Sequence, residues 1–321
     1  MSGDATEVTP ASAVNFRAGE SIANALTVRI DTARQIKLYA TVPADVVVDV
    51  VGYFVPASGA GEAPAGGRFT AITPVRVYDA AADPAGPLPA REAAVVSVAT
   101  DQRGAREVVP QGASAVAYNI TVVRPDGAGH LQVMPGDQVN SESSAINWTT
   151  RGDVVANGSI VKVDDERRIR VFNAAGVPVR FLVDVVGYYS DVGALFFPVE
   201  PARVLDTRRA HGGAGPIGSG EAHQRTGGVA TALGTAIEQV PSGAMAVAYN
   251  LTVAGTGSGG HLRVSPAGTG VVSASTINWP GAGYSRANGS VVAVSAAREV
   301  TIYNGAGTPT EAIIDVFGYY K

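Results

Sequence analysis

Apolar and polar residues alternate with a period of two along most of this chain. The pattern is clear in "HLQVM" at 130–134, "IRVFN" at 169–173 and "RFLVDVVGYY" at 180–189. Gly, Pro, Asn or Asp separates each of these runs from the next. Alternation over four to eight residues between such turn residues is typical of β-strands with one buried face. No window of twelve or more residues carries an apolar stripe of helical period with caps, so we expect strands almost throughout.

The strands recur in a long repeat. The sequence "AVAYNITVVRPDGAGHLQVMPG" at 115–136 matches "AVAYNLTVAGTGSGGHLRVSPA" at 246–267. The offset between the two copies is constant, and it relates Asn119 to Asn250, Trp148 to Trp279 and Asp184 to Asp315. A fixed period of this length indicates tandem copies of one structural unit.

The repeat divides the chain into four parts. Residues 68–190 and 191–321 are two complete units, and the Pro/Gly/Ala-rich residues 56–67 have the composition of a linker. Residues 1–55 align with the back half of a unit only, because Asn15, Phe16, Asn24 and Asp49 correspond to Asn147, Trp148, Asn157 and Asp184. We therefore predict an N-terminal half-repeat that packs on its neighbour or is completed by another polypeptide.

About 125 residues with many short strands per unit favour an all-β fold. We predict tandem antiparallel β-sandwich domains of barrel-like shape, two full repeats plus the half-repeat. A β-trefoil fits the length but would need a threefold subdivision of each unit. The composition supports strands and turns, with 39 glycines, 19 prolines and only 16% charged residues.

These motifs carry a resemblance to a known module. In order, they are "PARVLDTR", "VPSGAMAVAYNLTV", "GGHLRVSPAG", "SASTINW", "RANGSVVAV", "VTIYN" and "IIDVFGYY". Together they resemble a β-repeat found in secreted and surface proteins of actinobacteria and in some virion proteins of their phages. The resemblance implies a non-catalytic module for display or adhesion, without a cofactor. The first unit departs from it, since "VRVYDAA" at 75–81 stands where the second has "ARVLDTR".

An aspartate lies inside the last apolar run of each copy, at Asp49, Asp184 and Asp315. An unpaired charge inside a sheet is costly, so we expect these carboxylates to bond to the backbone or to Arg76 and Arg203. A metal ligand and a solvated sheet face are the alternatives. The pairs Gly187–Tyr188 and Gly318–Tyr319 follow, and we interpret them as structural devices at a strand end.

Each full unit also holds one tryptophan beside an asparagine and one histidine in a glycine-rich turn. An exposed indole next to an amide would suit a sugar ring, although one large aromatic residue per sandwich is more typical of a core. The candidate ligand-binding residues are Trp148, Asn147, His130, Trp279, Asn278 and His261.

Several function classes lack their sequence signals. The net charge of −4 comes without a basic stripe, which argues against nucleic acid as a partner. No apolar run reaches the length of a membrane span, and the N-terminus has no signal-peptide pattern. With no cysteine and no catalytic or phosphate-binding motif, we predict no cofactor, no metal site and no catalytic residue. A glycosidase dyad, Asp79 with Asp184 or Asp206 with Asp315, is the remaining enzymatic hypothesis.

The sequence thus leads to a structural or attachment protein located outside the cell, in a virion or on a cell surface. Its expected partners are other protein chains, as a homo-oligomer or a larger assembly, with another chain as the candidate to complete residues 1–55. The second hypothesis is a secreted carbohydrate-binding or adhesion protein with a cell-surface glycan as ligand.

Overall fold

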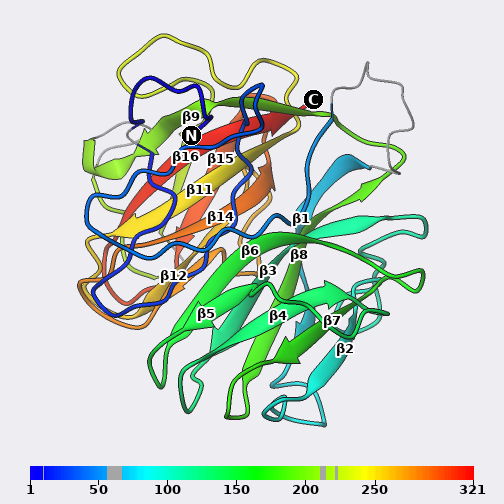
Figure 1. Ribbon diagram of the computed structural model, residues 1–321. Coiled ribbons are helices and arrows are strands. Elements are labelled where there is room, and N and C mark those ends of the chain that lie inside the picture. Colours follow the sequence, from blue (N-terminus) through cyan, green and yellow to red (C-terminus); the bar gives the residue numbers. More distant parts are fainter. Residues whose placement is uncertain (10, 56–66, 210–214, 221–222) are drawn as a thin grey trace.

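The protein consists of two β-sandwiches and an N-terminal segment that lies against them (Figure 1). The structure is a computed structural model that describes residues 1–9, 11–55, 67–209, 215–220 and 223–321. Strands account for nearly all of its regular structure, with one short 3-10 helix, η1 (Thr207–Arg209). The predicted all-β fold is confirmed.

The first unit, domain 1, contains two four-stranded antiparallel sheets. Their strand orders are β1-β8-β3-β6 and β2-β7-β4-β5, so strands that are distant in sequence lie side by side. The strands are β1 (Arg68–Asp79), β2 (Ala93–Ser97), β3 (Ala115–Val123), β4 (Gly129–Pro135), β5 (Ile146–Trp148), β6 (Val154–Lys162), β7 (Arg168–Asn173) and β8 (Arg180–Ser190).

The second unit, domain 2, repeats this topology strand for strand. Its sheets have the orders β9-β16-β11-β14 and β10-β15-β12-β13. The strands are β9 (Phe196–Asp206), β10 (Gln224–Gly228), β11 (Ala246–Ala254), β12 (Gly260–Pro266), β13 (Ile277–Trp279), β14 (Arg286–Ala293), β15 (Glu299–Asn304) and β16 (Glu311–Tyr320). Each sheet keeps two edge strands, so both units are sandwiches rather than closed barrels.

Each sandwich encloses its own hydrophobic core. In domain 1 the core includes Val116, Leu131, Trp148 and Phe181, each at most 2% exposed. Domain 2 encloses the equivalent side chains. The alternation seen in the sequence therefore places every second side chain between the two sheets of a unit.

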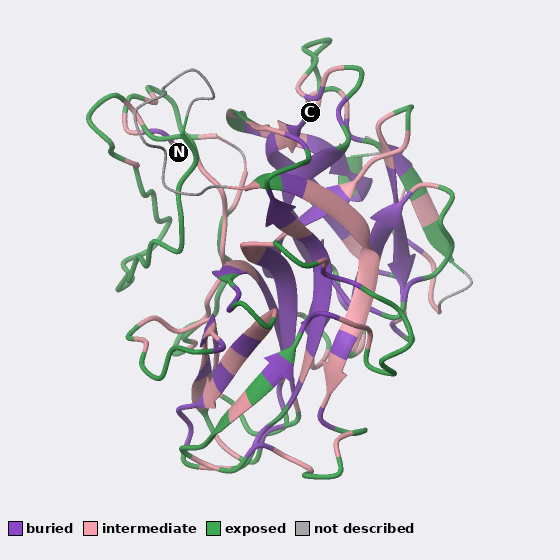
Figure 2. Ribbon diagram, turned by 90° about the vertical axis from the view of Figure 1, so that its right-hand side faces the viewer, coloured by how far each residue is buried: buried purple, intermediate pink, exposed green. Residues whose placement is uncertain are grey.

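A third core joins the two domains. Ala117 and Val186 of domain 1 and Ala248 and Val291 of domain 2 belong to it, with Phe69, Tyr189 and Tyr320 among the larger members. In β3, Ala117 lies between Val116 and Tyr118, which belong to the core of domain 1. The outer faces of the sheets that contain β3 and β11 thus pack on each other, and Figure 2 shows that both units contain buried strands.

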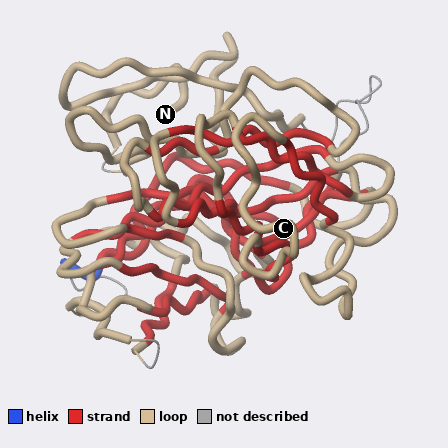
Figure 3. Tube along the Cα trace, turned by 90° about the horizontal axis from the view of Figure 1, so that it is seen from below, coloured by secondary structure: helices blue, strands red, loops and turns tan. Residues whose placement is uncertain are grey.

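No strand occurs among the described residues of the segment 1–55, where an isolated bridge joins Ser2 to Ile36. Figure 3 draws the chain around the N-terminus as loop, and Figure 2 shows much of it exposed. The sequence predicted a strand at "VVVDVV", yet Val47 and Val50 are 87% and 81% exposed. The linker predicted at 56–67 lies outside the described residues except for Gly67.

The strand order explains why the segment forms no sheet. Residues 21–29 and 45–55 correspond to β6 and β8, and in domain 1 both of these strands pair with β3. The segment has no counterpart of β3, so its two strand-like stretches lack the strand that would lie between them. It keeps the turn of the repeat, however, since Arg34, Arg167 and Arg298 all have φ near 60°.

Candidate functional site

The two buried aspartates are held by arginines from the opening strands. Arg76 Nε lies 2.9 Å from Asp184 Oδ1 and Arg76 Nη2 lies 3.1 Å from Oδ2. In domain 2 the same atoms of Arg203 lie 2.8 and 3.2 Å from those of Asp315. Both carboxylates are inaccessible to solvent, at 0% exposure. Each pair is a two-point charge-assisted contact between the first and the last strand of a sandwich.

Burial raises the pKa of Asp184 and of Asp315, although the hydrogen bonds from the arginines act in the opposite direction. The carboxylates proposed as glycosidase partners, Asp79 and Asp206, lie 3.6 Å from the same arginines. Each arginine therefore bonds to both members of a pair. A glycosidase needs two carboxyl groups facing a sugar-sized opening, whereas Asp206 and Asp315 are both fully buried.

The first copy of the motif is different, because Asp49 is exposed. The opening strand that would supply its arginine has no counterpart in the segment. The same motif therefore lies in two different environments. Its aspartate is buried and paired with an arginine only in the two complete units.

Both tryptophans lie in the sandwich cores. Trp148 and Trp279 are 2% and 1% exposed, and their Nε1 atoms donate hydrogen bonds of 2.6 Å to the carbonyl oxygens of Gly127 and Ser258. An indole with both faces covered offers no platform for a sugar ring. The structure therefore contradicts the ligand-binding interpretation of the tryptophans.

The other candidate ligand-binding residues lie opposite one another on neighbouring strands. His130 is the register partner of Asn147, and His261 is that of Asn278. Burial lowers the pKa of His130, and the nearby charge of Arg91 lowers it further. Asn278 is 9% exposed and accepts a hydrogen bond from Ser275 Oγ, so these groups do not form an open polar site with the tryptophans.

The glycines of the closing motif make room for an aromatic ring. A Cβ at Gly187 would collide with the ring of Phe69, and one at Gly318 would collide with that of Phe196. The register of β8 on β3 also shifts beside Gly187. The glycines are therefore required for the close approach of the opening strand.

The tyrosines that follow these glycines are half-buried packing residues. Tyr188 packs against the core of domain 1. Tyr319 stacks on Phe197, with ring centroids 5.2 Å apart and an interplanar angle of 13°. Both cover a sheet surface beside the opening strand.

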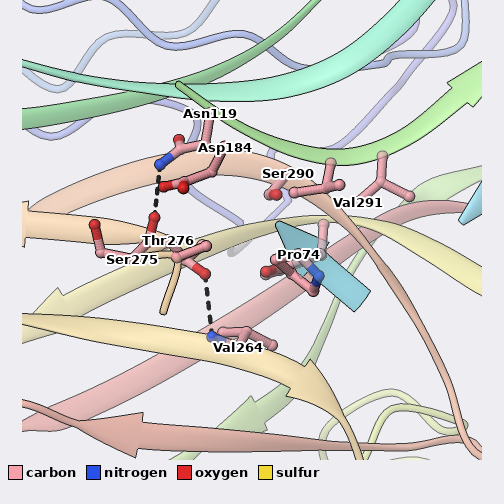
Figure 4. Close-up of a pocket in the computed structure, with 11 residues that line it drawn as sticks. Pro74, Asn119, Asp184, Val264, Ser275, Thr276, Ser290 and Val291 are labelled. Atoms are coloured by element: carbon pink, nitrogen blue, oxygen red, sulfur yellow. Dashed lines mark hydrogen bonds between the residues drawn. The ribbon is translucent and has the colours of Figure 1, made fainter. Parts of the chain in front are cut away.

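Sequence reasoning missed the side chains that connect the units, which are repeated asparagines. Asn288 Nδ2 donates to Asn119 Oδ1 over 2.9 Å, and Asn288 Oδ1 accepts from the backbone amide of Gly158 over 2.8 Å. Asn119 Nδ2 in turn donates to the carbonyl oxygen of Ser275 over 2.7 Å, as Figure 4 shows. The asparagines are at most 2% exposed, so these bonds lie in a dry interface between the domains.

The same contacts recur between the N-terminal segment and domain 2. Asn24 Nδ2 donates to Asn250 Oδ1 over 3.0 Å, and Asn24 Oδ1 accepts from the amide of Gly289 over 2.6 Å. Asn250 Nδ2 donates to the carbonyl oxygen of Ser12 over 2.5 Å. Every atom here is the sequence equivalent of one in the junction between domains 2 and 1. The segment thus occupies the place of a third unit.

An aromatic cluster lies where the three parts meet. The hydroxyl groups of Tyr189 and Tyr320 are 2.9 Å apart, and Phe54 is their sequence equivalent in the segment. The ring of Phe54 lies 4.6 Å from Phe196, 6.3 Å from Tyr189 and 6.4 Å from Tyr320 between centroids. Phe69 contacts Tyr320 at 4.4 Å. Residues of all three parts therefore form one aromatic cluster, in which Phe54 is 42% exposed.

The cavity at the junction of the domains is small. Asn119, Asp184, Ser275 and Ser290 are among its lining residues (Figure 4). Its volume of about 10 Å³ is room for roughly one water molecule. Among the described residues, no group of three histidine or acidic side chains is placed to hold a metal ion.

In the part of the chain that the structure describes, no helix has the length and apolar character needed to cross a bilayer.

Comparisons with known proteins give little further information. No protein-family model matches the chain, and a search of curated proteins finds no significant match. Among solved structures, it is similar to the PBSX exported protein XepA, with 15% identity, coverage of 84% of this chain and 99% of that one, and a TM-score of 0.23. It is also similar to the coconut allergen cocosin, with 12% identity, coverage of 79% and 86%, and a TM-score of 0.18. TM-scores this low support no conclusion about fold or function.

Proposed function

We propose that the protein is a non-catalytic structural or attachment protein, a β-repeat building block of a larger assembly. A virion tail, fibre or capsid decoration and a cell-surface appendage are assemblies of this kind, which places the protein outside the cell. The observation that carries the proposal is that the recurring asparagines bond to other parts of the chain. Asn119, Asn250 and Asn288 are used in buried contacts that join one part of the chain to another.

The interfaces support this role by their chemistry. The contact of domain 1 with domain 2 combines an apolar core with buried asparagine bonds and the buried pair of Arg286 and Asp153, whose atoms lie 3.2 Å apart. Buried polar bonds fix register and orientation, because an unpaired group in a dry interface is costly. Rigid joining of repeated units suits a protein whose task is to hold a position in an assembly.

The size of the protein in solution tests the proposal. We expect sedimentation equilibrium and negative-stain microscopy to show regular oligomers or filaments, alone or with a cognate partner. A chain that stays monomeric with every protein encoded beside it would contradict the proposal.

A glycan array separates the proposal from the carbohydrate-binding hypothesis. We expect no specific glycan to bind the wild-type protein, because the indoles are buried. Saturable binding of one glycan class, lost on substitution of Asn147 or His130, would favour the secreted adhesion protein instead.

A further inference from the structure

Each part of the chain contacts the next one in the same way, as in a ring of three units in which every contact runs in the same sense. Domain 2 presents Asn288 to Asn119 of domain 1, and the segment presents Asn24 to Asn250 of domain 2. The same rotation would make domain 1 present its own equivalent residue, Asn157, to a front-half asparagine beside the segment. Two junctions of a three-unit ring are thus formed within this chain, and both follow one geometry.

The aromatic residues independently support the ring. Phe69 of domain 1 contacts Tyr320 of domain 2, and Phe196 of domain 2 contacts Phe54 of the segment. In a closed ring, a phenylalanine from the front half of the third unit would contact Tyr189 of domain 1. Five of the six residues of such a ring are present here and contact one another, and the sixth belongs to the half-unit that the segment lacks.

The third junction, between domain 1 and the segment, lacks hydrogen bonds that the other two junctions have. Asn157 is 3% exposed, and its Nδ2 donates to the carbonyl oxygen of Ala145 over 2.5 Å. Asn24 and Asn288 make the equivalent bonds, to the carbonyl oxygens of Ala13 and Thr276. The Oδ1 atom of Asn157 has no hydrogen-bond partner within the described residues.

The contacts of domain 1 with the segment include a bond of 3.5 Å from Asn147 Nδ2 to Ser21 Oγ and the rings of Tyr189 and Phe54, 6.3 Å apart between centroids. At the two formed junctions the oxygen equivalent to Asn157 Oδ1 accepts from the backbone amide of Gly158 or Gly289, and Ala25 holds this position in the segment. A buried amide oxygen without its partner costs free energy, so the third junction is incomplete as it stands.

The segment beside this junction has two strand-like stretches but no strand between them. Residues 21–29 and 45–55 correspond to strands that flank β3 in a complete unit, and valines of the second stretch are exposed. A sheet that lacks its central strand offers unpaired backbone groups on both sides of the gap. An added strand would satisfy them and cover the valines in one step.

We propose that this gap is a docking site for a strand of another polypeptide, which supplies the front half of the third unit and closes the ring. The strand resembles β3 and β11, with the pattern "AVAYNxTV", and its asparagine bonds to Asn157 Nδ2 and to the carbonyl oxygen of Ser144. A neighbouring phenylalanine–arginine strand, like β1, brings the arginine for Asp49. A second copy of this chain does not offer such a strand, because its own β3 and β11 lie inside complete sheets. The inference rests on the proposed structural role and names the partner for it.

One residue distinguishes the third junction from the other two. A Cβ at Gly158 would collide with the carbonyl oxygen of Gly289, and a Cβ at Gly289 would collide with that of Ala25. Ala25 is the third residue of this set and carries a Cβ. The third junction therefore closes less tightly than the others, and Ala25→Gly should tighten it.

A strand-addition experiment on the full chain tests the proposal. The probe is a synthetic peptide with the sequence of residues 246–254, "AVAYNLTVA", extended by lysines at both ends for solubility. We expect saturable binding, measured by titration calorimetry, and new protection of the amides of residues 45–55 in hydrogen exchange. A peptide with leucine in place of the asparagine loses its bonds to Asn157 Nδ2 and to the carbonyl oxygen of Ser144. It should bind roughly thirtyfold more weakly, the factor expected for two lost buried hydrogen bonds.

Variants of the chain locate the site. Asn157→Leu should weaken binding of the asparagine peptide and leave binding of the leucine peptide unchanged. Ala25→Gly should strengthen binding of the asparagine peptide. Thermal melts identify any variant that fails to fold, and Ala25→Gly then carries the test.

Three outcomes would overturn the proposal. They are equal binding of both peptides, amides of residues 45–55 that are already protected in the isolated chain, and protection that appears with self-association in the absence of peptide. The last outcome would make a second copy the occupant. Regular assemblies without peptide binding would contradict this inference alone and leave the proposed function in place.

Discussion

The aspartate in the closing motif shows how strongly the surroundings decide the role of a residue. Asp184 and Asp315 are fully buried and are paired with arginines, whereas Asp49 is exposed in the same local sequence. The sequence could identify the arginines as partners because they recur in the opening strands. It could not place the tryptophans, because one indole per unit suits both a core and a binding surface.

Replacement of the buried aspartate tests its structural role. Asp315→Asn removes the closer of the two carboxylates that neutralise Arg203, a side chain that is 10% exposed, and leaves Asp206 at 3.6 Å. Breaking a buried pair in this way should lower the free energy of unfolding by about 3 kcal/mol. Urea denaturation followed by tryptophan fluorescence measures the loss. Asp49→Asn is the matched control and should leave the midpoint unchanged, so equal effects of both substitutions would contradict the assignment.

At the scale of elements, the strand order decides which parts of the sequence fold into sheets. Alternation predicted the strands of both domains, and it also predicted one at 46–51 that the structure lacks. Alternation describes a strand and its faces, whereas a sheet also needs neighbours for both edges. The sequence of one unit likewise does not indicate that the face of β3 with Ala117 is covered by another unit, because apolar residues occur on both faces of β3. The role of Asn119 and Asn288 was missed for the same reason.

The closest backbone approach between the domains gives a second prediction. Gly158→Ala places a Cβ against the carbonyl oxygen of Gly289, and overpacking of this kind costs about 1–3 kcal/mol. We expect the interface between the domains to weaken first, so that urea denaturation changes from one transition to two. Gly176→Ala is the control, since a Cβ there has no atom within 4 Å. A single unshifted transition for Gly158→Ala would show that the domains are not joined at this point.

The contact of the segment with the rest of the molecule can be tested at two adjacent residues. Phe54 lies 4.6 Å from Phe196 between ring centroids, whereas its neighbour Tyr53 is 71% exposed. Phe54→Ala should destabilise the protein by about 1 kcal/mol, the usual contribution of an aromatic pair, and should increase hydrogen exchange in residues 11–29. Tyr53→Ala should change neither quantity. If the two variants behave alike, the segment is not anchored through the aromatic cluster.

At the scale of the whole molecule, buried tyrosines occur in all three hydrophobic cores, those of the two domains and the one between them. Tyr118 and Tyr249 each lie inside one sandwich, and Tyr189 and Tyr320 meet at the junction. Burial raises the pKa of all four, and at Tyr189 the neighbouring Tyr320 adds to the effect. Each hydroxyl group therefore stays protonated in the folded protein over a pH range in which it ionises in the unfolded chain.

This difference predicts how stability changes in alkaline solution. Above pH about 10, the ordinary pKa of tyrosine, the unfolded chain binds fewer protons than the folded protein, so the free energy of unfolding falls as pH rises. Each buried tyrosine contributes a slope of up to roughly 1.4 kcal/mol per pH unit there. Urea midpoints measured across this range should fall steeply, and tyrosinate absorbance from these residues should appear together with unfolding. Tyr320→Phe should remove one contribution to the slope. Gradual ionisation of all the tyrosines without loss of stability would mean that the junction is open to solvent.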